Sequence, residues 1–184
     1  MDPVPSSPVA VESAVLVPVP EAERVVSGHR GRLDRAALWG VPAHVTVLYP
    51  FVAPSAITAA TIAVLAGAVE TISAFDCDFP ATAWFGEEVM WLAPQPDGPF
   101  RALTRAVSAA FPGYLPYGGV YDDAVPHLTV GDRPPGGAAE LRAVEADAQR
   151  WLPIQARISR VWLMTGNALR GGWHTVAELP LTAG

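Results

Sequence analysis

Two short stretches of similar sequence decide the fold of this chain: residues 43–50 read AHVTVLYP, and residues 125–130 read VPHLTV. Both contain the pattern His-x-Thr followed by an apolar residue, and in both a proline comes shortly before the histidine. Each stretch is rich in β-branched residues, which favours a strand. Because side chains alternate between the two faces of a strand, each motif presents an imidazole and a hydroxyl on one face and apolar side chains on the other.

The two motifs bring four polar side chains into one pattern. His44 and Thr46 share a face of the first predicted strand, and His127 and Thr129 share a face of the second. A single His-x-Thr in a strand is a weak signal, since most such histidines are half-buried structural residues. Two copies at equivalent places of the chain are much harder to obtain by chance. The sequence therefore predicts one cleft between two related lobes, with these four side chains around it.

Helices and strands alternate around each motif in a similar order. The order is β-α-β-α-β in the first half and β-α-β-α-β-β in the second, which is typical of a fold with two related halves. Strand pairing does not follow from this pattern. We expect strands over residues 13–19, 43–49, 75–85, 89–93, 125–130, 154–164 and 173–179, and helices over 21–38, 55–73, 97–111 and 138–152.

Length and composition indicate one globular unit. The chain has 184 residues, of which 51% are hydrophobic and 16% charged, so it can bury a core of its own. The single cysteine, Cys77, excludes an internal disulfide and a site built on several cysteines. We expect residues 1–12 to form a disordered tail and residues 13–184 to form a single bilobal domain. No targeting signal or membrane-spanning run is visible in these residues, and we therefore expect a cytoplasmic protein.

The charge limits the partners. The net charge is −6, the isoelectric point is near 5.1, and all 12 basic residues are arginines. Extended binding to nucleic acid requires many phosphates to be neutralised, so an acidic chain is a poor binder of long nucleic acid. A single phosphate in a local site is still accommodated. We expect a monomer that binds a small nucleotide or an RNA end and has no membrane partner.

The motifs and their surroundings resemble those of the two-histidine (2H) phosphoesterase superfamily, close to the bacterial 2′-5′ RNA ligase family. The similar residues are 44–51 (HVTVLYPF) and the stretch from Tyr117-Gly118-Gly119 to Val130, and the similarity covers about residues 13–180. The resemblance implies an α+β, pseudo-twofold, bilobal fold, in which two antiparallel sheets flank a central cleft with helices on the outside.

Residue chemistry and the resemblance together predict a reaction. Opening a cyclic phosphodiester with water requires a base on one side of phosphorus and an acid on the other, and imidazole suits both because its pKa is near neutral. We expect His44 and His127 to be catalytic and Thr46 and Thr129 to bind the phosphate, in a cyclic or 2′-5′ phosphodiesterase without metal or cofactor. The pattern does not say which histidine is the base.

Three alternatives remain beside hydrolysis. The enzyme can run in the other direction and join RNA ends 2′-5′, or the same cleft can bind nucleotides or RNA ends without catalysis. A metal site on His44 and His127 is disfavoured, because threonine is a poor ligand and no carboxylate lies two or four residues after either histidine. The substrate, the base preference and the pathway are not encoded in these patterns.

Other residues near the motifs are candidates for secondary roles. Tyr49 follows His44 by five residues, on the opposite face if the strand stays regular, and is expected in the core. Four aromatic side chains are candidate substrate contacts, by stacking or hydrogen bonding: Tyr117, Tyr121, Trp39 and Phe51. Three arginines lie close to the motif strands in sequence and can clamp a phosphate: Arg32, Arg35 and Arg133.

Overall fold

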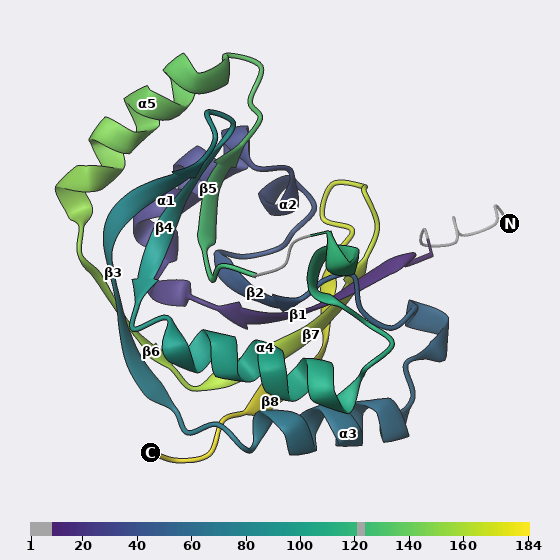
Figure 1. The fold of residues 1–184 in the computed structure, drawn as a ribbon. Helices are drawn as coiled ribbons and strands as arrows, with labels where there is room; N and C mark the ends of the chain where they lie inside the picture. Colours follow the sequence, from purple (N-terminus) through teal and green to yellow (C-terminus); the bar gives the residue numbers. More distant parts are fainter. Residues whose placement is uncertain (1–8, 121–123) are drawn as a thin grey trace, which may run out of the picture.

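The motif strands lie at the edges of two antiparallel sheets that meet in the middle of the molecule. This computed structural model describes residues 9–120 and 124–184, and within these ranges each sheet has four strands. The sheet orders are β2-β1-β7-β8 and β5-β4-β3-β6, so β2 and β5 occupy corresponding edges. These two strands contact each other at the centre of Figure 1. The α+β bilobal fold with two antiparallel sheets is confirmed.

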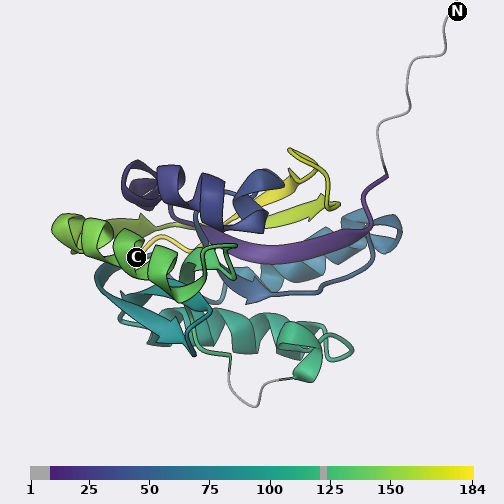
Figure 2. The same cartoon turned by 90° about the horizontal axis from the view of Figure 1, so that it is seen from above.

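The predicted strands are present, most of them with shifted ends, and the strand predicted over residues 154–164 forms two strands. All neighbouring strands in both sheets are antiparallel. The first sheet contains β1 (Glu12–Pro18), β2 (His44–Leu48), β7 (Arg160–Gly166) and β8 (His174–Pro180). The second contains β3 (Phe75–Phe85), β4 (Val89–Gln95), β5 (Leu128–Asp132) and β6 (Ile154–Ile158). Figure 2 shows elements of the two sheets as layers, with β1 and β8 in purple and yellow and the β3–β4 hairpin in teal.

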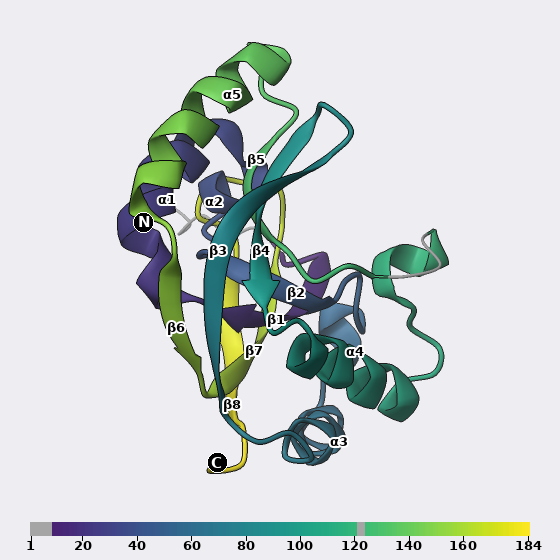
Figure 3. The same ribbon diagram turned by 60° about the vertical axis from the view of Figure 1, so that its left-hand side comes forward.

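Helices cover the outer faces and bind the halves together. The α-helices are α1 (Pro20–Leu33), α2 (Arg35–Leu38), α3 (Ala59–Val69), α4 (Gly98–Ala110) and α5 (Gly137–Ala148), with 3-10 turns η1 (Pro54–Ala56), η2 (Pro116–Gly119) and η3 (Gln149–Trp151). Helix α1 packs on β5 and β6 of the second sheet, whereas α4 packs on β2 of the first. Helices α3 and α4 lie side by side (Figure 3). Each half therefore supplies a helix to the other half's motif strand.

One hydrophobic core runs through both sheets. Its largest cluster joins Val15 and Val45 of the first sheet to Phe79 and Leu128 of the second, all with 0% exposure. Apolar burial of this kind contributes about 25 cal/mol per Å², so each sheet depends on the other for much of its stability. No helix in the described ranges is long and apolar enough to cross a membrane. Residues 1–8 of the predicted N-terminal tail lie outside the described residues.

The single helix predicted over residues 21–38 is wrong, because the chain is interrupted at Asp34. Asp34 is extended, with φ −126° and ψ 116°, and separates α1 from α2. Its side chain accepts a hydrogen bond from the Ala36 N–H at 2.9 Å and caps α2. A short carboxylate competes in this way for backbone donors and favours a helix start over a helix interior. The interruption turns α2 toward the motif strands.

The start of the next helix is also shifted. We expected it to begin at Ser55, but Pro54–Ala56 form a 3-10 turn and α3 begins at Ala59. Thr58 and Thr61 form a capping box, in which each side chain bonds the other residue's backbone N–H at 3.2 Å. Because this pair satisfies two N-terminal donors at once, it fixes the helix start.

The strand predicted over residues 154–164 divides between the two sheets. Ile154, Ala156 and Ile158 are buried in β6, beside β3, and the alternation changes parity before Val161 and Leu163 are buried in β7, beside β1. Two consecutive exposed residues, 159 and 160, lie at the change. A one-residue shift exchanges the faces of a strand, so the chain leaves one sheet here and enters the other.

Candidate functional site

A cleft of about 610 Å³ lies between the two motif strands. Each motif contributes three lining residues, at the histidine, at the threonine and five residues after the histidine. These are His44, Thr46 and Tyr49 from the first motif and His127, Thr129 and Asp132 from the second. The structure thus brings the four predicted motif residues together on one cleft.

A β-bulge in each motif strand explains the third position. In β2, Val15 pairs with Leu48 but Leu16 pairs with Thr46, so Val47 is the extra residue. In β5, Met90 pairs with Gly131 but Trp91 pairs with Thr129. A bulge adds one residue and reverses the parity that follows. The residue five positions after each histidine therefore reaches the cleft, and the prediction that Tyr49 is a core residue is wrong.

Both histidines are held in the same tautomer by a hydrogen bond to the backbone carbonyl two residues earlier in the chain. Nδ1 of His44 lies 2.7 Å from the Pro42 carbonyl oxygen, and Nδ1 of His127 lies 2.7 Å from the Val125 carbonyl oxygen. A carbonyl only accepts, so each Nδ1 carries a hydrogen and donates it. In the neutral ring, Nε2 is then the acceptor. Each ring therefore offers Nε2 for proton transfer.

Burial favours the neutral form of both imidazoles, and more strongly that of His44. Desolvation lowers the pKa of His44 to about 3, with the positive charge of Arg30 and the neighbouring His127 adding to the effect. Desolvation also lowers the pKa of His127, opposed by its hydrogen bond to Val125. The two histidines have matching hydrogen bonds, but only the pKa of His44 is also lowered by the charge of Arg30.

The Arg30 side chain is buried behind the first motif. Nε and Nη2 donate to Oδ2 of Asp34 at 3.0 and 2.8 Å, and Nη1 and Nη2 approach the Val41 carbonyl oxygen at 3.4 and 3.3 Å. Oε1 of Glu23 accepts from the Ala43 N–H at 2.6 Å and lies 4.0 Å from Nη1 of Arg30. This network holds the segment that leads into His44. Sequence reasoning missed it, because Arg30 belongs to a helix with no motif.

The two threonines are half-buried and line the cleft. Within the described part of the chain, neither hydroxyl has a hydrogen-bond partner, unlike the histidine Nδ1 atoms. A hydroxyl can donate one hydrogen bond while its oxygen stays available as an acceptor. Both hydroxyls are thus suited to bind an oxyanion between the histidines.

The predicted aromatic contacts divide into three groups. Trp39 and Tyr117 line the cleft, and the Tyr117 ring lies nearly parallel to His127 with centroids 6.3 Å apart. Phe51 is a core residue with 5% exposure, packed on Phe111 at 4.8 Å, so its proposed role as a substrate contact is wrong. Tyr121 lies outside the described residues.

Other cleft aromatics were not singled out from the sequence. The Phe85 ring approaches His127 edge-on, with ring centroids 5.0 Å apart. Trp173 also lines the cleft, and its backbone N–H donates to the backbone carbonyl of Trp39 at 2.8 Å. These residues follow no motif and lie far from both motifs in sequence. With Tyr49 and Tyr117 they add aromatic surfaces to a cleft that is otherwise lined by aliphatic and polar residues.

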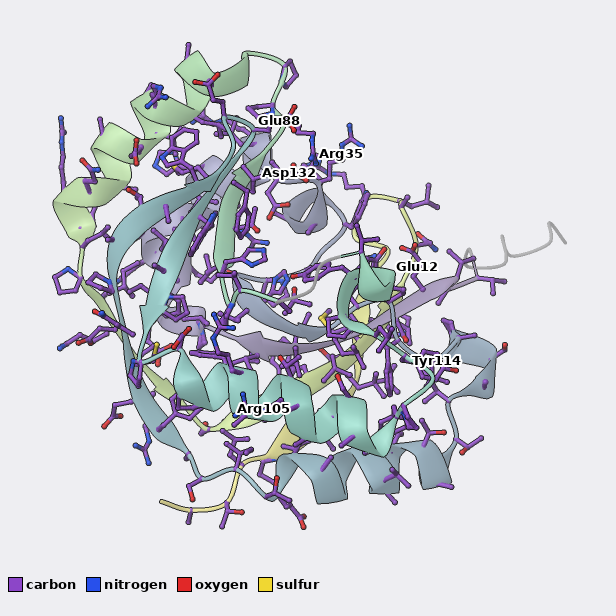
Figure 4. All side chains as sticks on the ribbon, in the orientation of Figure 1. Glu12, Arg35, Glu88, Arg105, Tyr114 and Asp132 are labelled. Atoms are coloured by element: carbon purple, nitrogen blue, oxygen red, sulfur yellow. The ribbon has the colours of Figure 1, made fainter. Side chains whose placement is uncertain are left out.

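Of the three candidate arginines, Arg133 lines the cleft, whereas Arg32 and Arg35 do not. Nε of Arg133 donates to Glu88 at 2.9 Å, and Nη1 donates to Asp132 at 3.1 Å. Figure 4 shows Arg35, Glu88 and Asp132 together at one end of the molecule, between α2 and the β3–β4 hairpin. Among the described residues, no group of three His, Cys, Asp or Glu side chains has the geometry of a metal site.

Comparison with known proteins places the chain among structures of the same fold. The family model described as the 2′-5′ RNA ligase superfamily matches residues 17–169. Escherichia coli LigT complexed with 3′-AMP is similar with a TM-score of 0.59 at 13% identity, over 95% of this chain and 99% of that one. The Thermus thermophilus protein TT0787 is similar with a TM-score of 0.60 at 12% identity, over 94% and 98%. No curated protein sequence matches the chain.

Proposed function

The chain belongs to the 2′-5′ RNA ligase superfamily, and from this premise we propose that it is a phosphoesterase that opens a 2′,3′-cyclic phosphodiester by acid–base catalysis. The observation that carries the proposal is the pairing of His44 and His127 in one cleft, in one tautomer, each with a threonine beside it. The cleft volume of about 610 Å³ suits a small nucleotide. E. coli LigT, which shares the fold, has been crystallised with 3′-AMP, ATP and NADP⁺.

The proposed reaction uses one proton transfer at each histidine. Nε2 of His44 takes a proton from water as the water oxygen attacks phosphorus. The bond from phosphorus to one ribose oxygen breaks, and protonated His127 gives that oxygen its proton. The product is a nucleoside monophosphate in which one of the 2′ and 3′ hydroxyls has been freed. We assign the base to His44 because Arg30 adds to the burial that keeps His44 neutral.

The test is hydrolysis of the four nucleoside 2′,3′-cyclic phosphates with excess chelator, using a His44→Ala/His127→Ala double variant as the control. We expect turnover that is insensitive to chelator and absent from the double variant. Binding without turnover contradicts the hydrolase and favours a binding module. Formation of 2′-5′ linkages from cyclic-phosphate and 5′-hydroxyl RNA ends, without hydrolysis, favours the ligase direction.

The threonines provide a graded prediction. Thr46→Val or Thr129→Val removes one hydroxyl with little change of shape and is expected to lower kcat/KM by about 10- to 100-fold, the value of one hydrogen bond to a charged group. Thr→Ser at the same positions keeps the hydroxyl and should retain most activity. Steady-state kinetics on the preferred cyclic nucleotide makes the comparison. Equal losses of kcat/KM in the Val and Ser variants would show that the threonines act through the packing of their methyl groups and not through their hydroxyls.

The pH dependence follows from the two lowered pKa values. The free enzyme needs neutral His44, which requires a pH above about 3, and protonated His127, which requires a pH below a pKa that lies under the usual 6.5. We therefore expect kcat/KM to fall as the pH rises from 5 to 8. The bound phosphodiester anion favours imidazolium, so the corresponding limb of kcat lies at higher pH. A kcat/KM profile that rises from pH 5 to 8 would contradict the assignment.

A further inference from the structure

The positions five residues after the two histidines break the symmetry of the cleft. The first motif places the phenol of Tyr49 there, and its hydroxyl donates a hydrogen bond to Oε1 of Glu12 at 3.1 Å. The second motif places the carboxylate of Asp132 there. The Asp132 side chain is 40% exposed, and its Oδ1 accepts from Nη1 of Arg133. A carboxylate has about four lone-pair sites, so Asp132 has acceptor capacity beyond this bond.

The surroundings of Asp132 disfavour a second phosphate. Asp34 also lines this end of the cleft, and the negative charge of Asp132 helps to raise the pKa of the Asp34 carboxyl, although burial is the main cause. The positive charge of Arg133 is shared between Glu88 and Asp132, and that of Arg30 faces Asp34 and Glu23. This end therefore favours hydrogen-bond donors on a ligand over anionic groups.

Asp132 lies within reach of a nucleoside whose phosphate is bound at the motif residues. Because of the bulge, Thr129 and Asp132 pair with Trp91 and Val89, which are two residues apart on β4, so at about 3.3 Å per residue they are separated by roughly 7 Å along the sheet. With the phosphate between the histidines and threonines, the base extends toward Asp132. The same cleft is lined by Phe85 and Val89 of the β3–β4 hairpin, with Val89 paired to Asp132, and by Ala36 and Trp39 of the other lobe. Apolar and aromatic walls of this kind hold a flat base by stacking.

Donor chemistry selects among the bases. Guanine presents N1–H and the 2-amino group side by side, and these two donors match the two oxygens of a carboxylate. Adenine and cytosine present an amino group beside an acceptor nitrogen, which repels a carboxylate lone pair, and uracil presents one N–H between two carbonyls. Resting on the proposed function, we propose that Asp132 reads the base of the substrate and makes the enzyme selective for guanosine 2′,3′-cyclic phosphate.

Kinetics with matched substrates tests the selectivity. We expect kcat/KM for guanosine 2′,3′-cyclic phosphate to exceed that of the other three nucleotides by about 10-fold or more, and that of the inosine analogue, which lacks only the 2-amino group, by a smaller factor. Asp132→Asn should reduce these ratios to near 1. Glu88→Gln is the matched control, because Glu88 is another carboxylate that binds Arg133 and it does not line the cleft. Its ratios should stay at the wild-type value.

Binding of products separates this inference from the proposed function. Guanosine, inosine and adenosine 3′-monophosphates are not turned over, so calorimetry on the wild-type protein measures base preference even if hydrolysis fails. Tighter binding of the guanosine compound, lost in Asp132→Asn and kept in Glu88→Gln, supports the role of Asp132. Equal affinities for the three compounds overturn it, as does a loss of preference in both variants, which would assign the effect to Arg133.

Discussion

Replacing either cleft histidine with alanine is expected to lower kcat for cyclic-phosphate hydrolysis by about 10²- to 10⁴-fold and to leave the fold intact. In the proposed reaction His44 removes a proton from water and His127 protonates the leaving ribose oxygen, so neither role is filled by the other ring. The two single losses should not multiply in the double variant, because the histidines act in one concerted exchange. Single-turnover kinetics measures the chemical step directly.

His174 supplies the matched control for these variants. It is exposed on β8, where its Nε2 lies 3.1 Å from the Thr165 hydroxyl, and it does not line the cleft. His174→Ala should retain wild-type kcat. Near-wild-type turnover in His44→Ala or His127→Ala, with a native circular dichroism spectrum, would show that the histidine concerned transfers no proton in the rate-limiting step.

The sequence was enough to predict the site's centre because both signals are local. A His-x-Thr in an alternating strand places both polar groups on one face, whatever the strand pairs with. Its repetition in a second strand indicated a shared cleft, and the structure brings His44, Thr46, His127 and Thr129 together there. The two motifs and their surroundings carried the family resemblance, the resemblance implied the bilobal α+β fold, and both the family and the fold are confirmed.

The rest of the site depends on information that no local pattern holds. A bulge forms only when a strand is paired, so the positions of Tyr49 and Asp132 depend on the registers of β1–β2 and β4–β5. Strict alternation assigned Tyr49 to the core for this reason. Phe85 at the end of β3 and Trp173 just before β8 are far from the motifs in sequence, and the assembled sheets bring them to the cleft.

Removing the buried guanidinium behind the first motif is expected to be the most destabilising single change away from the apolar core. Arg30 is 2% exposed and binds Asp34, itself 5% exposed. Arg30→Met leaves this carboxylate buried without its cation, which costs about 3–5 kcal/mol of unfolding free energy. It also removes a charge that lowers the pKa of His44, so the limb of kcat/KM set by His44 protonation should move to higher pH. Urea unfolding and the pH–rate profile measure the two effects.

The pH dependence of the stability lost in Arg30→Met identifies the cause of that loss. Burial already raises the pKa of Asp34 and Arg30 opposes this, so the carboxyl in Arg30→Met has a still higher pKa. A raised carboxyl pKa means that the folded state holds more protons, and stability then falls as the pH rises from 3.8 toward the folded value. The loss should therefore be larger at pH 8 than at pH 5.

A double-mutant cycle that combines Arg30→Met with Asp34→Asn tests whether the lost stability comes from the unpaired carboxylate. Asp34→Asn removes the carboxylate charge but keeps an oxygen to cap α2 at Ala36. Added to Arg30→Met, it should recover part of the lost stability at pH 8 and little at pH 5, where Asp34 is closer to neutral. Arg24→Met, at an exposed position on the same helix, should change stability by no more than about 0.5 kcal/mol. A pH-independent loss that Asp34→Asn does not relieve would assign the role of Arg30 to packing around Val41 instead of to charge.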